Sequence, residues 1–447
     1  MKKRNLAVLL TMGMAFSMLA GCGSSSQTDS ASDTTSGSAA ESAAETEAES
    51  ASDEEAAGEK KTLTVWVRES TAEAAKSAAE KYNQIQDAVN VEVVVQVSSS
   101  VAEQFTLALA AGEAPDVISL DCTKVPYFAA NGAFTDISDR YEALEYKDQF
   151  SEGMMKSGQV DGKTYAVPFS PDVSVLLYNK DHYTEAGLDP EDPPETWDEL
   201  IEYSQKLTNG DRYGYVYAGG HNSAYLFTFM PYVWNNGGEF LSEDGKQCLL
   251  NEEKAIEAVQ LLSDMINVYK VTPPSTISYS WGEAQDAFLT GQASQIVLGS
   301  AAIYNFVNGT ADMNWGACLI PKGPSGSGYA SFSGGDSIGI TSQCEDVEEA
   351  WKFIEYALSE DVQVEELAKG GCLPARKDFF DNEYFDATPQ YEVLKEALEV
   401  SHTPYSLKYD EMYTPILDNM QRCLNQEVTP EEAVNTITEQ INALLAE

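Results

Sequence analysis

Hydrophobic and polar residues alternate in two short runs near the start of the folded part of the chain. Leu63, Val65 and Val67 are separated by Thr64 and Trp66, and valines occupy every second position over residues 89–97. A period of two residues is typical of a β-strand. The segment between the two runs is rich in helix formers. The pattern is therefore strand, helix, strand, which requires parallel pairing of the strands with a right-handed crossover.

The pattern continues in the same way beyond the second run. A helix is expected over residues 101–111, and the sequence Gly112-Glu113-Ala114-Pro115 ends it before a short apolar strand over residues 116–120. Four more strands are expected, at residues 165–169, 173–178, 295–298 and 337–340, with helices between them. Strands alternating with helices predict the α/β fold class with a doubly wound beginning.

Three helix starts carry a capping box, in which a hydroxyl residue precedes a Glu three positions later. They begin at Thr196, Ser280 and Thr429. Pro430 at the first helical position strengthens the last of them. Apolar residues of that final helix fall on one stripe, so it is expected to pack by one face.

The first 22 residues have the order of an export signal. Three basic residues at positions 2–4 precede an apolar run from Leu6 to Leu19, which ends in Leu19-Ala20-Gly21-Cys22. This order resembles a bacterial lipoprotein signal, and it predicts removal of residues 1–21 and lipidation of Cys22. The alternative is a transmembrane helix, but the apolar run is shorter than the roughly 20 residues that cross a bilayer.

The charge of the chain is strongly negative and is mostly carried by the predicted folded part. Residues 22–60 are rich in Ser, Ala, Thr and Glu, and without large apolar residues they are expected to form a disordered acidic tether. The whole chain has a formal net charge of -45, and residues 61–447 keep 62 acids against 23 bases. Nucleic acid and anionic lipid surfaces are excluded as partners, since both require clustered Lys and Arg.

Metal, nucleotide and cofactor chemistry find no support in the sequence. The three histidines, His182, His221 and His402, form no zinc-site pattern, and the chain has no P-loop or EF-hand loop. No cofactor and no metal are therefore expected. The six cysteines after Cys22 are scattered without a CxxC motif. They permit disulfides outside the cell, but we interpret them as small buried hydrophobic residues.

Six segments in order along the chain resemble the extracellular solute-binding proteins of ABC sugar importers, the maltose-binding-like group. The match runs through nearly all of residues 61–447. The segments are Leu109-Ala110-Ala111-Gly112-Glu113-Ala114-Pro115-Asp116-Val117, Asp161-Gly162-Lys163-Thr164-Tyr165-Ala166-Val167-Pro168, Tyr178-Asn179-Lys180-Asp181, Pro194-Glu195-Thr196-Trp197-Asp198-Glu199-Leu200, Asn236-Gly237-Gly238-Glu239-Phe240 and Ala287-Phe288-Leu289-Thr290-Gly291-Gln292-Ala293.

The resemblance implies two α/β lobes, each a mostly parallel sheet flanked by helices, joined by a hinge in the periplasmic-binding-protein fold. The N-terminal lobe would comprise residues 61–170 and 337–375, and the C-terminal lobe residues 171–336 and 376–447. Such a protein is not an enzyme. It would be a monomer that encloses a carbohydrate between its lobes and delivers it to an ABC transporter permease, anchored by the lipid on Cys22 at the outer face of the cytoplasmic membrane.

Charged residues that directly follow predicted strands are the first candidates for ligand contacts, because loops at the C-terminal ends of strands converge in α/β folds. Arg68 and Glu69 follow the first strand, and Asp121 follows the strand over residues 116–120. Each could equally be part of a polar loop. Ser170 and Asp336 lie where Pro and Gly are expected to interrupt strands, in the stretches that the resemblance assigns to the hinge.

Aromatic side chains are the second group of candidates, since their faces pack against the C–H side of a sugar ring. Trp234 is preferred because its neighbours are polar and Gly-rich, and Asn222 precedes its helix as a contact or a simple N-cap. Relatives often place a Gly-Pro-Trp turn after the strand that corresponds to 295–298. The turn here is Gly299-Ser300-Ala301-Ala302, which argues against a long stacked oligosaccharide and against maltose-type specificity. Tyr304 and Tyr413 are substitute platforms or core residues.

Two alternatives remain beside carbohydrate binding. An acidic cleft would also suit a polyamine or another small cation. A secreted serine hydrolase is the remote alternative, since Gly335-Asp336-Ser337-Ile338-Gly339 matches GxSxG and His402 follows. Its nucleophile needs a strand before the Ser and a helix after it, whereas Ser337 opens a predicted strand.

Overall fold

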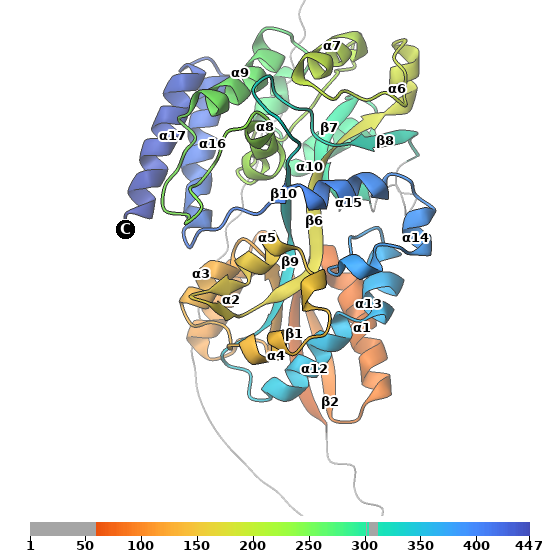
Figure 1. Ribbon diagram of the computed structural model, residues 1–447, viewed down its shortest axis with the longest axis vertical. Helices are drawn as coiled ribbons and strands as arrows, with labels where there is room; N and C mark the ends of the chain where they lie inside the picture. The colour runs from red at the N-terminus through yellow and green to blue at the C-terminus, as the bar shows by residue number, and fades with distance from the viewer. Residues whose placement is uncertain (1–59, 301, 304–311) are drawn as a thin grey trace, which may run out of the picture. The chain divides into compact units, whose positions relative to one another are not determined.

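The computed structural model describes residues 60–300, 302–303 and 312–447. It begins with three parallel strands, β1 (Lys61–Arg68), β2 (Val89–Gln96) and β3 (Val117–Asp121), with β1 between the other two. Helices α1 (Ala72–Ile85) and α2 (Val101–Ala111) connect them. The predicted α/β beginning is confirmed (Figure 1).

The main sheet has the strand order β2-β1-β3-β9-β6-β7, with β8 beside β6 and β10 beside β9. The other strands are β4 (Gln159–Val160), β5 (Lys163–Thr164), β6 (Val167–Asn179), β7 (Gln295–Gly299), β8 (Trp315–Cys318), β9 (Ser331–Ile340) and β10 (Ser401–His402). The other helices are α3 (Val125–Ala130), α4 (Ser138–Glu142), α5 (Glu152–Ser157), α6 (Lys180–Glu185), α7 (Trp197–Leu207), α8 (Met230–Asn235), α9 (Glu253–Asn267), α10 (Trp281–Leu289), α12 (Val347–Ala357), α13 (Glu360–Val362), α14 (Glu383–Asp386), α15 (Tyr391–Glu399), α16 (Tyr413–Leu424) and α17 (Pro430–Leu445).

Two long strands, β6 and β9, pair antiparallel and run side by side through the middle of the fold (Figure 1). The expectation that Pro168, Pro171 and the glycines at 334 and 335 interrupt the strands was wrong, because β6 and β9 continue through these positions. Pro171 is tolerated since β7 and β8 pair with β6 only from Ser174 onward, so its missing N–H falls on a side without a neighbouring strand. A register shift between Pro168 and Ser170 absorbs the other proline.

Apolar residues gather into cores at both ends of this strand pair. The first core packs β1, β2, α1 and α12 around the beginning of β6 and the end of β9, including Val167, Phe169 and Ile338. The second core contains α8, α9, α16 and α17, with Val173 and Val175 of β6 in an adjoining cluster. The polar and Gly-rich stretches at the centre of β6 and β9 therefore lie between the first core and the second core.

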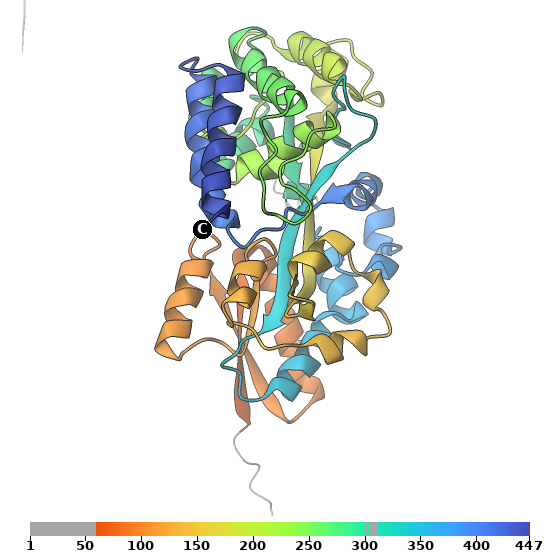
Figure 2. The ribbon, with the colours of Figure 1, turned by 60° about the vertical axis from the view of Figure 1, so that its left-hand side comes forward.

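The helix ends follow the capping signals of the sequence. Thr196, Ser280 and Thr429 each accept a hydrogen bond from the backbone N–H of the Glu three residues later, and each of those glutamates binds back. All three predicted capping boxes are confirmed. The final helix, α17, packs by one face against α9 and α16, and the α16–α17 pair is seen side by side in Figure 2.

The described residues contain six cysteines, and none of them forms a disulfide. Cys122, Cys248 and Cys423 are buried, in agreement with their interpretation as small hydrophobic residues. Within the described ranges, no helix is long and apolar enough to cross a membrane, and no cluster of three or more His, Cys, Asp or Glu side chains could hold a metal ion.

Candidate functional site

A cavity of about 350 Å³ lies at the centre of β6 and β9, between the first core and the second core. Ser170, Pro171 and Asp172 of β6 form part of its wall, and Gly334, Gly335 and Asp336 of β9 lie beside them. It is further lined by Arg68, Ser70, Thr71, Ser98, Asp121, Thr123, Ser223, Phe227, Trp281, Gln285, Leu298, Gly299, Ser300, Ala302, Phe332, Cys372, Tyr409 and Tyr413.

Arg68 holds two carboxylates at one side of the cavity. Its Nε lies 2.5 Å from Oδ1 of Asp336, and its Nη1 lies 3.2 Å from Oδ2 of Asp121. The side chain of Asp336 is only 1% exposed, whereas those of Arg68 and Asp121 are 17% and 28% exposed. The guanidinium therefore neutralises a buried charge and leaves part of Asp121 open to the cavity.

The strand register brings these three residues together. Arg68 ends β1 and Asp121 ends β3, which pairs with β9 so that Asp121 and Asp336 are direct partners. The remaining carboxylate oxygens are also bonded. Oδ1 of Asp121 accepts from the N–H and the hydroxyl of Thr123, and Oδ2 of Asp336 accepts from the hydroxyl of Thr71 at 3.3 Å. The geometry is fixed before any ligand arrives.

Burial and pairing act in opposite directions on the ionisation of this network. Burial raises the pKa of Asp336 above its ordinary value, and the charge of Arg68 opposes that shift. Burial also disfavours the charged form of Arg68, but Asp336 and Asp121 outweigh it and raise the pKa of the guanidinium. Arg68 is thus a permanent cation that holds the carboxylates of Asp121 and Asp336 in place.

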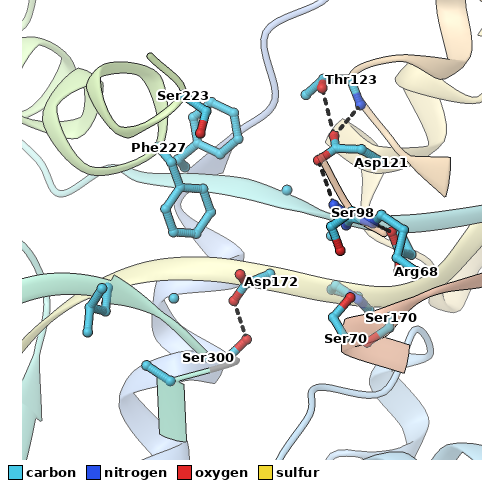
Figure 3. A pocket seen from close by; sticks show the side chains of 18 of the residues that line it. Arg68, Ser70, Ser98, Asp121, Thr123, Ser170, Asp172, Ser223, Phe227 and Ser300 are labelled. Carbon is cyan, nitrogen blue, oxygen red and sulfur yellow. Dashed lines mark hydrogen bonds and ion pairs between the residues drawn. The ribbon is translucent and has the colours of Figure 1, made fainter. Parts of the chain in front are cut away.

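A third carboxylate, Asp172, faces the cavity from β6 (Figure 3). The hydroxyl of Ser300, just after β7, donates to its Oδ1 at 2.5 Å. Gly299 is the partner of Ser174 across the two strands, and a Cβ on it would lie 2.4 Å from Oδ2 of Asp172. The absence of a side chain at Gly299 therefore makes room for this carboxylate.

Close contact between β6 and β9 also depends on a glycine. Gly335 has a φ of +99°, and a Cβ on it would lie 2.2 Å from the carbonyl oxygen of Ser170. Only glycine adopts this conformation readily at such a short backbone separation. Gly335 thereby allows the close pairing of β6 and β9 at the point where Asp172 and Asp336 line the cavity.

Aromatic rings line the cavity on the side of the second core. The ring centroid of Phe227 lies 6.1 Å from that of Trp281, in a T-shaped arrangement, and 5.3 Å from that of Phe332. Nε1 of Trp281 donates to the hydroxyl of Ser223, which fixes the indole plane. Figure 3 shows Ser223 and Phe227 across the cavity from Asp121 and Thr123.

Two further rings, those of Tyr409 and Tyr413, meet at 5.5 Å with a T-shaped geometry. Burial raises the pKa of both phenols, so they stay neutral and can donate and accept hydrogen bonds. The cavity thus combines apolar ring surfaces with carboxylates and hydroxyl groups.

Five of the residues proposed from the sequence line this cavity, and they are Arg68, Asp121, Ser170, Asp336 and Tyr413. Two others, Glu69 and Asn222, are not among its lining residues. Glu69 is exposed and accepts from the N–H of Ser98, and Asn222 accepts from the N–H of Ser223. Tyr304 lies outside the described residues.

Trp234, the aromatic preferred from the sequence, packs away from this cavity. It is 8% exposed and stacks on His402 at 5.0 Å and on Phe332 at 6.1 Å. A separate cavity of about 160 Å³ lies beside it and is lined by Glu239 and His402. The polar, Gly-rich residues next to Trp234 in the sequence did not predict that its ring is buried in a stack with other rings.

Sequence reasoning missed Asp172, Ser300, Phe227, Trp281 and Gln285 among the lining residues. Trp281 directly follows the capping residue Ser280, so its helical position was predictable although its exposure to the cavity was not. Phe227 belongs to a π-helical segment, Tyr225–Phe229, and no sequence period distinguishes such a segment. Asp172 could have been found from the sequence, because it is a polar residue that interrupts an apolar strand.

Ser337 and His402 do not form a catalytic pair. Ser337 lies within β9, 1% exposed, and its hydroxyl has no hydrogen-bond partner among the described residues. His402 lies on β10, where it is the strand partner of Phe332 on β9, and its ring stacks on Trp234. The hydrolase geometry that the motif required is absent from this part of the structure.

Comparison with known proteins agrees with this architecture. Residues 68–364 match the family model described as bacterial extracellular solute-binding protein. Maltodextrin-binding protein MdxE of Bacillus subtilis (strain 168) is 26% identical over 401 residues, covering 86% of this chain and 90% of that protein. A putative binding protein of Brucella abortus (strain 2308) is 27% identical over 249 residues, which are 55% of this chain and 59% of its own length.

The chain also resembles solved structures, among them an ABC transporter solute-binding protein from Thermotoga lettingae TMO, bound with alpha-D-tagatose. The TM-score is 0.78 at 27% sequence identity, and the match covers 86% of this chain and all of that chain.

Proposed function

Because this chain belongs to the bacterial extracellular solute-binding proteins, we propose that it captures a carbohydrate in the central cavity and delivers it to the permease of an ABC transporter. The family and the named relatives are binding proteins, and this chain is likewise not an enzyme. The ligand would be enclosed rather than transformed.

The composition of the cavity wall is the observation that carries this proposal. Sugars present C–H surfaces that pack on aromatic rings and hydroxyl groups that need paired donors and acceptors. Phe227 and Trp281 supply ring surfaces on one side, while Arg68 and Asp121 supply a pre-oriented cation and acceptor on the other. Maltodextrin in the name of one relative and tagatose in the structure of another agree with a carbohydrate ligand.

Ligand capture would depend on movement of two lobes, residues 61–170 with 337–375 and residues 171–336 with 376–447. The strands β6 and β9 cross between the first core and the second core at the cavity, so a change in their backbone angles would open or close it. Closure around a sugar would present a changed surface to the permease.

The lipid anchor belongs to the same proposal. Residues 1–59, which include Cys22, lie outside the described residues, and the role of the anchor rests on the order of charged, apolar and small residues alone. Lipidation at Cys22 would hold the binding protein at the outer face of the cytoplasmic membrane, next to its permease.

A polyamine or another small cation is the alternative ligand, and one feature of the cavity favours it. Asp121, Asp172 and Asp336 contribute three carboxylates, whereas Arg68 is the one basic residue among the described residues that line it. A cation would pair with Asp121 or Asp172. Aromatic rings suit both ligands, since they also attract cations.

A thermal-shift screen separates these ligands. The purified protein is heated with monosaccharides, oligosaccharides, polyamines and amino acids in turn. A ligand at 100 times its dissociation constant adds about 2.7 kcal/mol to the free energy of unfolding, which moves the melting temperature by several degrees. Stabilisation by a sugar is expected. Stabilisation by a polyamine alone would overturn carbohydrate binding and support the alternative.

A further inference from the structure

His221 does not line the central cavity, but it is hydrogen-bonded to a residue that does. Nδ1 of His221 lies 3.0 Å from Oγ of Ser223, and the same Oγ accepts a hydrogen bond of 3.2 Å from Nε1 of Trp281. Ser223 and Trp281 are among the described residues that line the cavity, and His221 is not. The three side chains therefore form a chain of hydrogen bonds from His221 to an aromatic ring in the cavity wall.

The backbone holds both ends of this hydrogen-bond chain in place. The turn that carries His221 packs against the segment before α10, where the N–H of Gly220 donates to the carbonyl oxygen of Tyr279 at 2.9 Å. A Cβ on Gly220 would lie 2.4 Å from the carbonyl oxygen of Ser278, so the absence of a side chain permits this contact. Tyr279 lies two residues before Trp281. The imidazole and indole centroids are thus kept 5.9 Å apart.

The three polar groups differ in what they can donate and accept. An indole N–H only donates, so Oγ of Ser223 accepts from Trp281 and keeps its own hydrogen. Nδ1 of a neutral imidazole that carries its proton on Nε2 accepts that hydrogen. A protonated imidazole has an N–H on both nitrogens, so Oγ would meet two donors and its hydrogen would lose its acceptor. The chain of hydrogen bonds is therefore complete only while His221 is neutral.

Burial favours this neutral form. It lowers the pKa of His221 below the ordinary value, because the charged imidazolium is poorly solvated in the partly buried position. Burial is the one cause of the shift among the described residues. The titratable residues on the adjoining segments do not contribute to it, and they are Glu283 and Asp286 of α10, both exposed, Tyr279 before that helix and Tyr225 after the turn.

We propose that His221 is a positioning residue for ligand binding, which acts through Ser223 to hold the indole of Trp281 in the orientation that lines the central cavity. The inference rests on the proposed carbohydrate function, since a ring must present its face to pack against the C–H side of a sugar. The Trp281 ring also meets that of Phe227, so a rotated indole disturbs a second ring of the same wall. Protonation of His221 should therefore lower the affinity for sugar.

The indole N–H of Trp281 reports on this hydrogen-bond chain without any ligand. Its signal in proton–nitrogen correlation spectra of the full chain is assigned with Trp281→Phe and followed from about pH 8 to about pH 5, across the range in which histidine titrates. The signal is expected to shift with pH in the unaltered protein and to stay in place in His221→Asn. A signal that stays in place in the unaltered protein, or that shifts equally in His221→Asn, would overturn the proposal.

Sugar affinity is the second measurement. Calorimetric titration is carried out at about pH 7.5, where an unperturbed histidine is neutral, with D-glucose, D-mannose, L-arabinose, D-tagatose, maltose and cellobiose. His221→Ala should weaken binding of a sugar roughly three- to tenfold, the effect of losing one supporting hydrogen bond. His221→Asn should restore the affinity to within about twofold, because its amide oxygen is an acceptor close to the position of Nδ1.

His182→Ala is the matched control. Nδ1 of His182 also lies 3.0 Å from a serine Oγ, that of Ser294, and neither residue is among those that line the cavity. This variant should change the affinity less than about twofold and leave the Trp281 signal unaltered. An unchanged affinity in His221→Ala, or a loss that His221→Asn does not restore, would overturn the positioning role and leave carbohydrate binding intact. If none of these sugars binds, the proposed function fails, and the indole signal still decides whether His221 positions Trp281.

Discussion

Arg68 and Asp336 are 268 positions apart in the sequence, yet their side chains form an ion pair of 2.5 Å in the wall of the central cavity. The carboxylate is buried and the guanidinium is its counter-ion. Each therefore depends on the other, because an isolated charge in this position would be costly. The consequences reach both stability and ligand binding.

Replacing the cation should leave a buried charge without its partner. Arg68→Met is expected to lower the free energy of unfolding by about 3–5 kcal/mol near neutral pH, the range for breaking one side of a buried pair. Urea denaturation measures this loss. Arg140→Met is the control, because Arg140 pairs with the 64%-exposed side chain of Glu348 and should cost less than about 1 kcal/mol. Equal losses would contradict the pairing.

The same variant should respond to pH in a defined direction. Burial raises the pKa of Asp336, and removing Arg68 removes the interaction that opposes this shift. A carboxyl whose pKa is higher in the folded than in the unfolded state favours folding at low pH and loses that contribution as the pH rises through its folded pKa. The stability deficit of Arg68→Met should therefore shrink as the pH is lowered towards about 4. A deficit that grows on acidification would refute this account.

Two adjacent glycines of β9 should differ sharply in their tolerance of a side chain. Gly335→Ala places a Cβ 2.2 Å from the carbonyl oxygen of Ser170 at a φ of +99°, and is expected to cost more than about 2 kcal/mol. The Cβ of Gly334→Ala meets side-chain ring atoms, those of Phe332 at 3.3 Å and of Phe227 at 3.5 Å, and the substitution should cost less. Denaturation midpoints of the two variants compare them directly. A smaller loss for Gly335→Ala would show that the pairing of β6 and β9 at this position does not require glycine.

Gly299 should matter more for ligand binding than for folding. Gly299→Ala directs a Cβ at the carboxylate of Asp172, 2.4 Å from Oδ2, so this group must move within the cavity. We expect ligand affinity to fall roughly tenfold or more, equivalent to about 1.4 kcal/mol. Gly282→Ala on α10 is the matched control, because no atom lies within 4 Å of its Cβ position, and it should retain full affinity. Calorimetric titration with the ligand from the thermal screen measures both.

The carboxylates of the central cavity should discriminate against anionic sugars. Arg68 is already paired with Asp121 and Asp336, and Asp172 adds a further acid. A uronic acid is therefore expected to bind at least about tenfold more weakly than the corresponding neutral sugar, because its carboxylate meets like charges. Asp172→Asn should narrow that difference. Tighter binding of the uronate would contradict this charge arrangement.

Part of the central cavity was predictable from local sequence. Arg68 and Asp121 follow apolar strands directly, and the ends of parallel strands meet at one edge of a sheet, so their convergence could be expected. The helix starts at Thr196, Ser280 and Thr429 were equally readable, because a capping box is a contact between residues three positions apart.

The ring positions were not predictable in the same way. Trp234 and Trp281 both lie at or near helices with polar neighbours, yet Trp234 is buried against His402 and Trp281 lines the cavity. The difference depends on which distant residues contact each ring, His402 and Phe332 for Trp234 but Phe227 for Trp281. The continuation of β6 through Pro171 likewise depended on where β7 and β8 begin to pair.

The sequence by itself determined the first three strands, the three capped helix starts, the α/β class and the charged strand ends, since periodicity and capping act between near neighbours. The tertiary structure decided which side chains share the cavity. Asp121 becomes the partner of Asp336 only through the antiparallel register of β3 and β9, and Asp172 meets Ser300 only where β7 ends beside β6. These contacts join residues more than a hundred positions apart, and no local preference encodes that distance.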